Sequence, residues 1–185
     1  MPIALIVFFA LVVLTIFTTI FIYNILVTKT AMTEEAWSGV EVQLKRRYDL
    51  IPMLIETVKS YASHEDKLFS KVLSSRENCL NSQGSPSELL EKEKDFTTNL
   101  RSIFALAENY PDLKANENFK EFQKQISKLE DEIQISRRYF NGTVRELNIS
   151  VQTFPGNIIA NLFHFKKQDF FDVDESETVI PEIKF

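Results

Sequence analysis

A long apolar stretch lies near the N-terminus and carries the clearest pattern in the chain. From Ile3 to Val27 it has no proline, no glycine and no ionisable side chain except that of Tyr23. A helix over this stretch is about 37 Å long, whereas the hydrocarbon core of a bilayer is about 30 Å thick. The sequence lacks the basic start, the short apolar core and the small-residue cleavage site of a signal peptide. We therefore expect a transmembrane anchor over residues 1–29.

After the anchor, apolar residues recur in steps of three and four, which is the spacing of one helix face. The first such run extends from Trp37 to Val72, and we expect its helix to continue to about Cys79. Pro52 removes one backbone hydrogen bond within this run and predicts a bend. The polar segment 81–84 predicts a break after the helix.

A second helix is predicted by Ser85 as N-cap, Pro86 at the first helical position and Glu88 three residues after the cap. Pro111 is expected to end it. Its heptad-like stripe consists of Leu89, Glu93, Phe96, Leu100, Ile103, Ala107 and Tyr110. This narrow stripe is typical of a helix that packs in a bundle.

The third helix has the strongest periodicity, beginning after a predicted cap at Asn116 and stopping at Pro155-Gly156. Three narrow apolar stripes joined by short loops predict an all-α fold, an up-and-down antiparallel bundle of three long helices. We expect a short C-terminal helix around 158–162 to fill the fourth position. The bundle domain would cover residues 30–163. An extended tail over residues 164–185 would then pack Phe170, Phe171 and Phe185 onto the bundle.

Composition and charge narrow the function. The chain has 185 residues, a net charge of −5 and no charged side chain before Lys29. Because phosphate binding needs clustered positive charge, we expect no nucleic-acid partner. Basic residues on the C-terminal side of the anchor predict a cytoplasmic domain with the N-terminus outside. These residues are Lys29, Lys45, Arg46 and Arg47.

Motifs of catalytic or metal chemistry are missing from the sequence. His64-Glu65 is not the start of a zinc-binding helix, because Leu68 stands where the second histidine would be. Cys79 is the single cysteine and has no partner for a disulfide or a thiolate metal site. The acidic clusters are best explained as solvated faces, and no phosphate-binding loop or G-x-S-x-G element occurs. We expect no catalytic residue, no metal and no cofactor.

One set of polar residues accompanies the apolar stripes and forms the candidate site. Part of the set follows a single stripe of the third helix, part ends the second helix, and part flanks Pro52. The set could be a recognition groove for a partner, or a half-buried hydrogen-bond network that fixes helix register. We favour the register network, because buried polar groups need such partners in any bundle. The residues are Arg47, Asp49, Glu108, Asn109, Tyr110, Arg137, Asn141, Arg145 and Asn148.

Several motifs resemble those of the LemA family over essentially the whole chain. The most distinctive run is LAENYPDLKANENF over residues 106–119. It is accompanied by RYDLIP at 47–52, ETVK at 56–59 and RRYFN at 137–141. Further matches are Tyr61 with His64-Glu65, Val144-Arg145, Asn148, Phe154-Pro155, Ala160, Phe170-Phe171, Pro181 and Phe185. The sequence departs from the family pattern at Met53, usually asparagine, at Tyr139-Phe140, where the aromatic order is reversed, and at His164, usually glycine.

The resemblance implies an N-terminal anchor, a cytosolic antiparallel bundle and a bacterial or archaeal source, but no reaction. Genes of the family often lie near those of membrane zinc proteases, which loosely suggests such a partner. We expect a non-enzymatic, single-pass membrane adaptor that contacts the lipid bilayer and an envelope protein. A self-assembling scaffold is the alternative, because heptad stripes can pair between chains to form a homo-oligomer. A hydrolase using clustered carboxylates is the third hypothesis.

Overall fold

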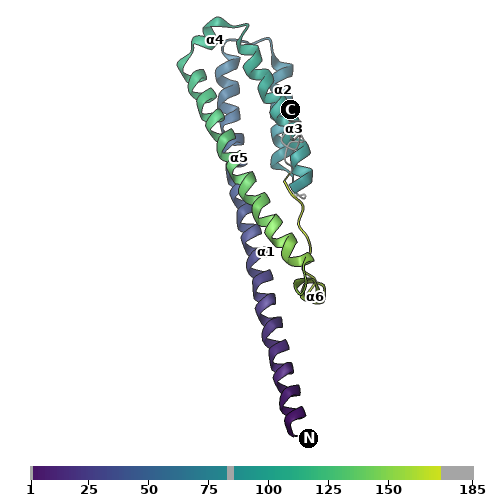
Figure 1. The fold of residues 1–185 in the computed structure, drawn as a ribbon. Coiled ribbons are helices and arrows are strands. Elements are labelled where there is room, and N and C mark those ends of the chain that lie inside the picture. Colours follow the sequence, from purple (N-terminus) through teal and green to yellow (C-terminus); the bar gives the residue numbers. More distant parts are fainter. Residues whose placement is uncertain (1, 83–85, 172–185) are drawn as a thin grey trace, which may run out of the picture. The chain divides into compact units, whose positions relative to one another are not determined.

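The computed structural model describes residues 2–82 and 86–171, and within them every regular element is an α-helix (Figure 1). The helices are α1 (Pro2–Lys59), α2 (Asp66–Leu80), α3 (Pro86–Ala107), α4 (Pro111–Ala115), α5 (Glu117–Gln152) and α6 (Gly156–Leu162). The prediction of an all-α fold is confirmed. The predicted cap at Ser85 lies outside the described residues.

The described residues fall into two compact units, and α1 and α5 each contribute to both. The N-terminal unit comprises residues 2–37 and 139–168, and the bundle unit comprises 38–82, 86–138 and 169–171. Within each unit α1 and α5 run antiparallel. Lys29 pairs with Glu146 in the N-terminal unit, whereas Arg47 pairs with Glu130 in the bundle unit.

The first amphipathic helix ends much earlier than the sequence pattern predicted. The expectation that it continues to about Cys79 is wrong, because α1 ends at Lys59 and a new helix, α2, begins at Asp66. The N–H groups of Tyr61 and Ala62 both donate to the carbonyl of Val58 and close the last turn. The reason is visible in the sequence, since the five residues 63–67 are all polar and offer no core-facing side chain. Pro52 remains inside the continuous α1.

Helix α2 therefore takes the fourth position of the bundle unit, where it packs along α3. The prediction that the short C-terminal helix fills this position is wrong, because α6 belongs to the N-terminal unit. The core of the bundle unit combines apolar side chains from its five helices. Its fully or nearly fully buried members include Leu44, Ile51, Leu54, Val58, Phe69, Val72, Phe96, Leu100, Ile103, Leu113, Phe119 and Ile133.

The connection between α3 and α5 follows local rules. Pro111 is the first residue of the short helix α4, where its missing N–H leaves no bond unmade. Asn116 caps α5 as predicted, since its Oδ1 accepts a hydrogen bond from the N–H of Phe119 at 3.0 Å. The same side chain donates through Nδ2 to the hydroxyl of Tyr61 at 2.9 Å, which ties this corner to the end of α1.

The N-terminal unit has a small apolar core of its own. Leu26 of α1 packs with Ile159 and Ala160 of α6, and Ile22, Val151 and Phe165 surround them. Asn148 of α5 exchanges two hydrogen bonds of 2.9 Å with the backbone of Gln168, which holds the irregular segment after α6. α6 is thus fixed against both long helices of this unit.

Candidate functional site

A buried carboxylate lies at the centre of the bundle unit. Glu93 of α3 is only 1% exposed. Its two oxygens accept hydrogen bonds from the Tyr48 hydroxyl and from the Arg47 guanidinium. The Arg137 Nη2 lies 3.5 Å from the same oxygen that Arg47 contacts. We call Arg47, Tyr48, Glu93, Glu130 and Arg137 the Glu93 network.

Arg47 is the cation most completely enclosed in this network. It is fully buried, and its second terminal nitrogen donates to Glu130 Oε1 at 2.5 Å. The guanidinium also lies 5.1 Å from the centre of the Phe96 ring, which Tyr48 contacts edge-on at 5.3 Å. The charge of Arg47 is therefore balanced by two carboxylates and supported by an aromatic face.

Helix periodicity explains why these residues meet. Arg47 and Tyr48 lie between the core positions Leu44 and Ile51, so α1 directs both into the bundle. Glu93 lies in the same stripe of α3 as Phe96. Glu130 and Arg137 are seven residues apart on α5, about two turns, and share one face.

Burial and the surrounding charges change the acid–base properties of four groups. Burial alone would lower the pKa of Arg47, but the carboxylates of Glu93 and Glu130 raise it. Burial lowers the pKa of Arg137, which the Glu93 carboxylate opposes and the charge of Arg47 reinforces. Burial and the charge of Glu93 raise the pKa of Tyr48, and the same two causes raise that of the Cys79 thiol to about 12. The phenol and the thiol are therefore neutral at pH 7.

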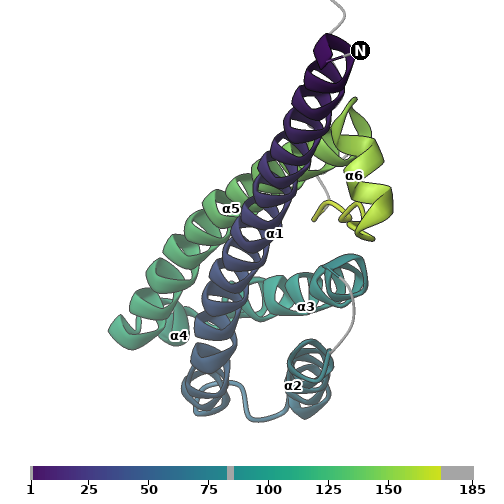
Figure 2. The ribbon, with the colours of Figure 1, turned by 90° about the horizontal axis from the view of Figure 1, so that it is seen from below.

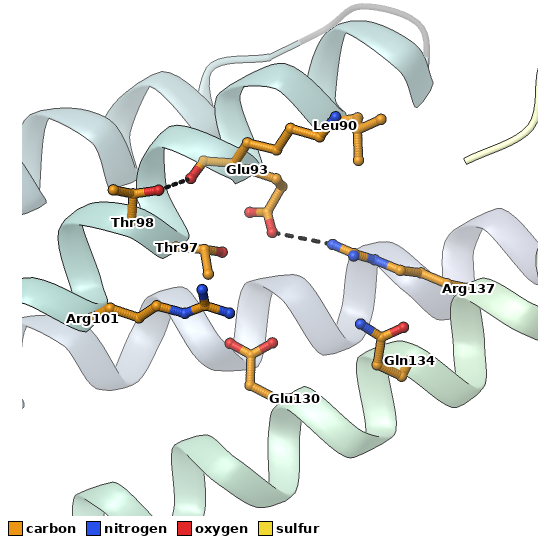
Figure 3. A pocket seen from close by; sticks show the side chains of 9 residues that line it. Leu90, Glu93, Thr97, Thr98, Arg101, Glu130, Gln134 and Arg137 are labelled. Carbon is orange, nitrogen blue, oxygen red and sulfur yellow. Dashed lines mark hydrogen bonds and ion pairs between the residues drawn. The ribbon is translucent and has the colours of Figure 1, made fainter. Parts of the chain in front are cut away.

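A cavity of about 250 Å³ opens beside the network, between α3 and α5 (Figure 3). Side chains of Thr97 and Arg101 on α3 and of Glu130, Gln134 and Arg137 on α5 line it and face one another across the opening. A second cavity of about 590 Å³ shares four of these residues and continues toward the apolar side chains of Leu100, Phe104 and Ile126. We call the two cavities together the α3–α5 groove.

The structure brings two of the predicted polar residues together and places the others elsewhere. Arg47 and Arg137 both contact Glu93. Asp49 is exposed, 4.0 Å from Arg76, and Glu108 pairs with Lys114 at 2.5 Å on the surface. The remaining members lie outside the network: Asn109 and Tyr110 before α4, and Asn141, Arg145 and Asn148 on the part of α5 in the N-terminal unit.

Sequence reasoning missed Glu93, Tyr48 and Glu130 as members of this set. The signal was present, because Glu93 stands in the apolar stripe of the second predicted helix. A carboxylate at such a position needs a buried cationic partner. Among the described residues no group of three or more His, Cys, Asp or Glu side chains is arranged to hold a metal ion.

Comparison with known proteins finds a family relationship. The model of the LemA family matches residues 36–185, which include the whole bundle unit and leave the entire apolar stretch, residues 3–27, outside the match. The resemblance drawn from the sequence motifs is thereby confirmed.

Individual proteins with similar sequences include a magnetosome protein and a protein LemA. The chain is 24% identical over 174 residues to magnetosome protein MamQ 2 of Paramagnetospirillum magneticum, covering 80% of this chain and 64% of that protein. It is 28% identical over 149 residues to protein LemA of Metamycoplasma hominis, covering 79% of this chain and 67% of that protein. The chain thus spans slightly less than two thirds of the MamQ 2 length.

Proposed function

The chain belongs to the LemA family, and from this premise we propose that it is a membrane-anchored, non-enzymatic adaptor that binds a partner polypeptide in the α3–α5 groove. The observation that carries the proposal is the groove itself, a charged recess that continues into an apolar one beside the buried pair of Arg47 and Glu93.

The exposed surface of α1 supports the membrane anchor. α1 is the one helix among the described residues that is long and apolar enough to cross a membrane. Every large apolar side chain from Ile3 to Phe21 is exposed, so this stretch is not the core helix of a soluble domain. The hydroxyls of Thr15, Thr18 and Thr19 donate to backbone carbonyls one turn earlier at 2.8–2.9 Å. No hydroxyl of these three threonines would be left unpaired in hydrocarbon.

The orientation with the N-terminus outside and the bundle unit in the cytoplasm is part of the proposal. It is supported by the excess of Lys and Arg after the span. Lys29, at the end of the apolar stretch, pairs with Glu146 at 3.1 Å, and Arg47 is held in the Glu93 network. Lys45 and Arg46 are exposed, and both add to the positive charge that follows the span.

The groove has the dimensions and chemistry of a site for a polypeptide segment. Its lining on α3 extends from Leu90 to Phe104, about 21 Å along the helix. Within the described residues the Nε of Arg137 is a buried donor without a hydrogen-bond partner. An acceptor group of a bound partner would satisfy it. Arg101 adds a second guanidinium from the α3 side of the groove, so the preferred segment has an acidic residue next to an apolar one.

Several buried groups that could perform chemistry are engaged in stabilising the fold, which supports a binding role. Arg47, Tyr48 and Arg137 all interact with Glu93. The raised pKa of Cys79 keeps its thiol protonated, and a thiol is a much weaker nucleophile than a thiolate. The partner is a protein of the cell envelope, and a membrane protease is one candidate.

Site-specific photo-cross-linking of the full-length protein in native membranes tests the groove. A benzoylphenylalanine at Gln134, an exposed residue that lines both cavities, should give one defined heterologous adduct. The matched control is Lys124, an exposed residue of the same helix that lines neither cavity. Arg101→Glu should weaken the Gln134 adduct about tenfold or more through charge repulsion.

Two results would contradict the adaptor proposal. Equal adducts from Gln134 and Lys124 would show that the groove is not the recognition surface. An adduct between two copies of the chain would favour the self-assembling scaffold instead.

A further inference from the structure

An exposed apolar face lies on and beside α6 in the N-terminal unit. Phe154, Ile158 and Leu162 follow one another at intervals of four residues, and Phe163 is adjacent. Phe154 is 79% exposed and Leu162 is 64% exposed, although both are large apolar side chains. We call these four residues the α6 platform. The other side of the same helix is buried, since Ile159 and Ala160 pack on Leu26.

The platform lies beside the end of the apolar stretch of α1. The ring of Tyr23 contacts that of Phe163 at 4.8 Å and that of Phe165 at 5.7 Å, both nearly edge-on. Ile22 and Leu26 belong to the same cluster as Ile159. All of these residues are in one compact unit, in which α6 lies beside the N-terminal half of α1 (Figure 2). A bilayer that holds residues 3–27 therefore also reaches α6.

Charge in this part of the chain fits a membrane surface. No Asp or Glu occurs from Leu147 to Gln168, although the whole chain has 26 of them. The exposed Lys166 and Lys167 follow the platform after only two residues, His164 and Phe165. Apolar and aromatic side chains next to lysines are the composition of segments that lie in the headgroup region and attract anionic lipids.

We propose that the α6 platform inserts into the membrane interface beside the transmembrane helix, and that Lys166 and Lys167 bind anionic lipid headgroups there. The membrane contact of the protein would then consist of a spanning helix and a second, interfacial helix. This explains why α6 exposes apolar side chains next to a buried core. The proposal rests on the anchor of the proposed function and is independent of the groove.

Fluorescence of a single tryptophan in the reconstituted full-length protein tests the platform. The native tryptophan is replaced by Trp37→Phe, and Leu162→Trp or, as a more conservative reporter, Phe163→Trp is introduced. The control reporter is Ile135→Trp, because Ile135 is an equally apolar and exposed position of the bundle unit. In vesicles of brominated phosphatidylcholine with phosphatidylglycerol, lipid should quench the platform reporters at least about threefold more than the control. Acrylamide should quench the control more.

Charge reversal tests the headgroup contact. The double variant Lys166→Glu/Lys167→Glu should reduce the lipid quenching at least about twofold when phosphatidylglycerol is present, and much less in phosphatidylcholine alone. An equal effect in both membranes would overturn the anionic-lipid part of the proposal.

The remaining outcomes separate the platform from the anchor. Loss of the protein from floating vesicles after alkaline carbonate washing would overturn the anchor and the platform together. Retention on the vesicles with a reporter open to acrylamide would overturn the platform alone. A reporter shielded from both acrylamide and brominated lipid would show that a protein surface, such as a second copy, covers α6, and would also overturn the platform.

Discussion

The two halves of α1 differ in the kinds of side chain that they expose and bury. In the N-terminal unit the helix exposes apolar side chains on all sides from Ile3 to Phe21 and has only a small core around Leu26. In the bundle unit the same helix buries a charged side chain, Arg47, and a phenol, Tyr48, against Glu93. The first half thus has an apolar surface, whereas the second half has charged and polar side chains in its core.

This difference shows what each half depends on. The first half needs an apolar environment around it, because uncovered apolar surface of this extent is unfavourable in water. The second half needs its charge pairs to be complete, because a buried charge without a partner costs several kcal/mol. Substitutions that leave one charge unpaired should therefore act on the bundle unit.

The largest effect is expected for Glu93→Gln. The change keeps the shape of the side chain but removes the charge that Arg47 and Arg137 share. Breaking a buried ion pair costs about 3–5 kcal/mol of unfolding free energy. Urea unfolding of the full chain in detergent, followed by circular dichroism, measures it. Glu91→Gln on the exposed face of the same helix is the control and should change stability by less than about 0.5 kcal/mol.

In the N-terminal unit, Gly156→Ala should have a large steric effect. A Cβ at Gly156 would collide with the backbone oxygen of Ser150, so the corner between α5 and α6 must move. Overpacking of this kind costs about 1–3 kcal/mol. Gly142→Ala is the matched control, because a Cβ there meets nothing within 4 Å. This second change should stabilise α5 by about 0.5–1 kcal/mol, and equal losses from both would contradict the packing of α6.

Alkaline pH should destabilise the bundle unit through Cys79. Its pKa is raised to about 12 in the fold, above the value near 8.5 expected for an unfolded thiol. The folded chain holds this proton more tightly than the unfolded chain does. The stability that the protonated thiol contributes is therefore complete below about pH 8.5 and is lost as pH rises toward 12.

The predicted loss from Cys79 is roughly 1–2 kcal/mol between pH 8.5 and pH 10. Urea unfolding of the wild type and of Cys79→Ala at these two pH values isolates it. The wild type should show the steeper decline. Equal declines would mean that the thiol is not held protonated.

The smallest effect concerns His164, which stands where the family usually has glycine. Its φ of 63° lies in the left-handed region that favours glycine. His164→Gly relieves this strain but makes the unfolded chain more flexible, so we expect a net gain of only about 0.5 kcal/mol. The melting temperature of the full chain measures the difference. A clear loss of stability would show that the imidazole makes a contact of its own.

Local signals predicted much of the fold. Helix α3 starts at Pro86, a residue without an N–H group that would need a partner in the first turn. Helix α5 starts after Asn116, whose side chain accepts a hydrogen bond from an N–H group of the first turn. The end of α1 was missed because the spacing from Ala62 to Phe69 fits a continuous stripe, although the residues between them are polar except Leu68. Periodicity alone does not show that a chain turns back, since α2 continues the stripe after the turn.

The candidate site was less predictable than the fold. Arg47 and Arg137 were selected, but their common partner, Glu93, was placed in an apolar stripe and given no role. Three helices bring these residues together, and the spacing within one helix does not reveal which faces meet. Glu93 was the one charged residue in the apolar stripe of its helix. This exception was informative, because a charge inside a bundle requires partners from other helices.

Spin labels at two valines of α1 distinguish a helix segment surrounded by lipid from one surrounded by water. Val13 is 56% exposed and Val42 is 47% exposed, so spin labels at Val13→Cys and Val42→Cys face outward equally well. The buried, protonated Cys79 should react far more slowly with the label. In vesicles, the label at position 13 should collide mainly with oxygen dissolved in lipid, and the label at position 42 mainly with a water-soluble nickel complex. Strong collision of both labels with nickel would contradict the membrane anchor.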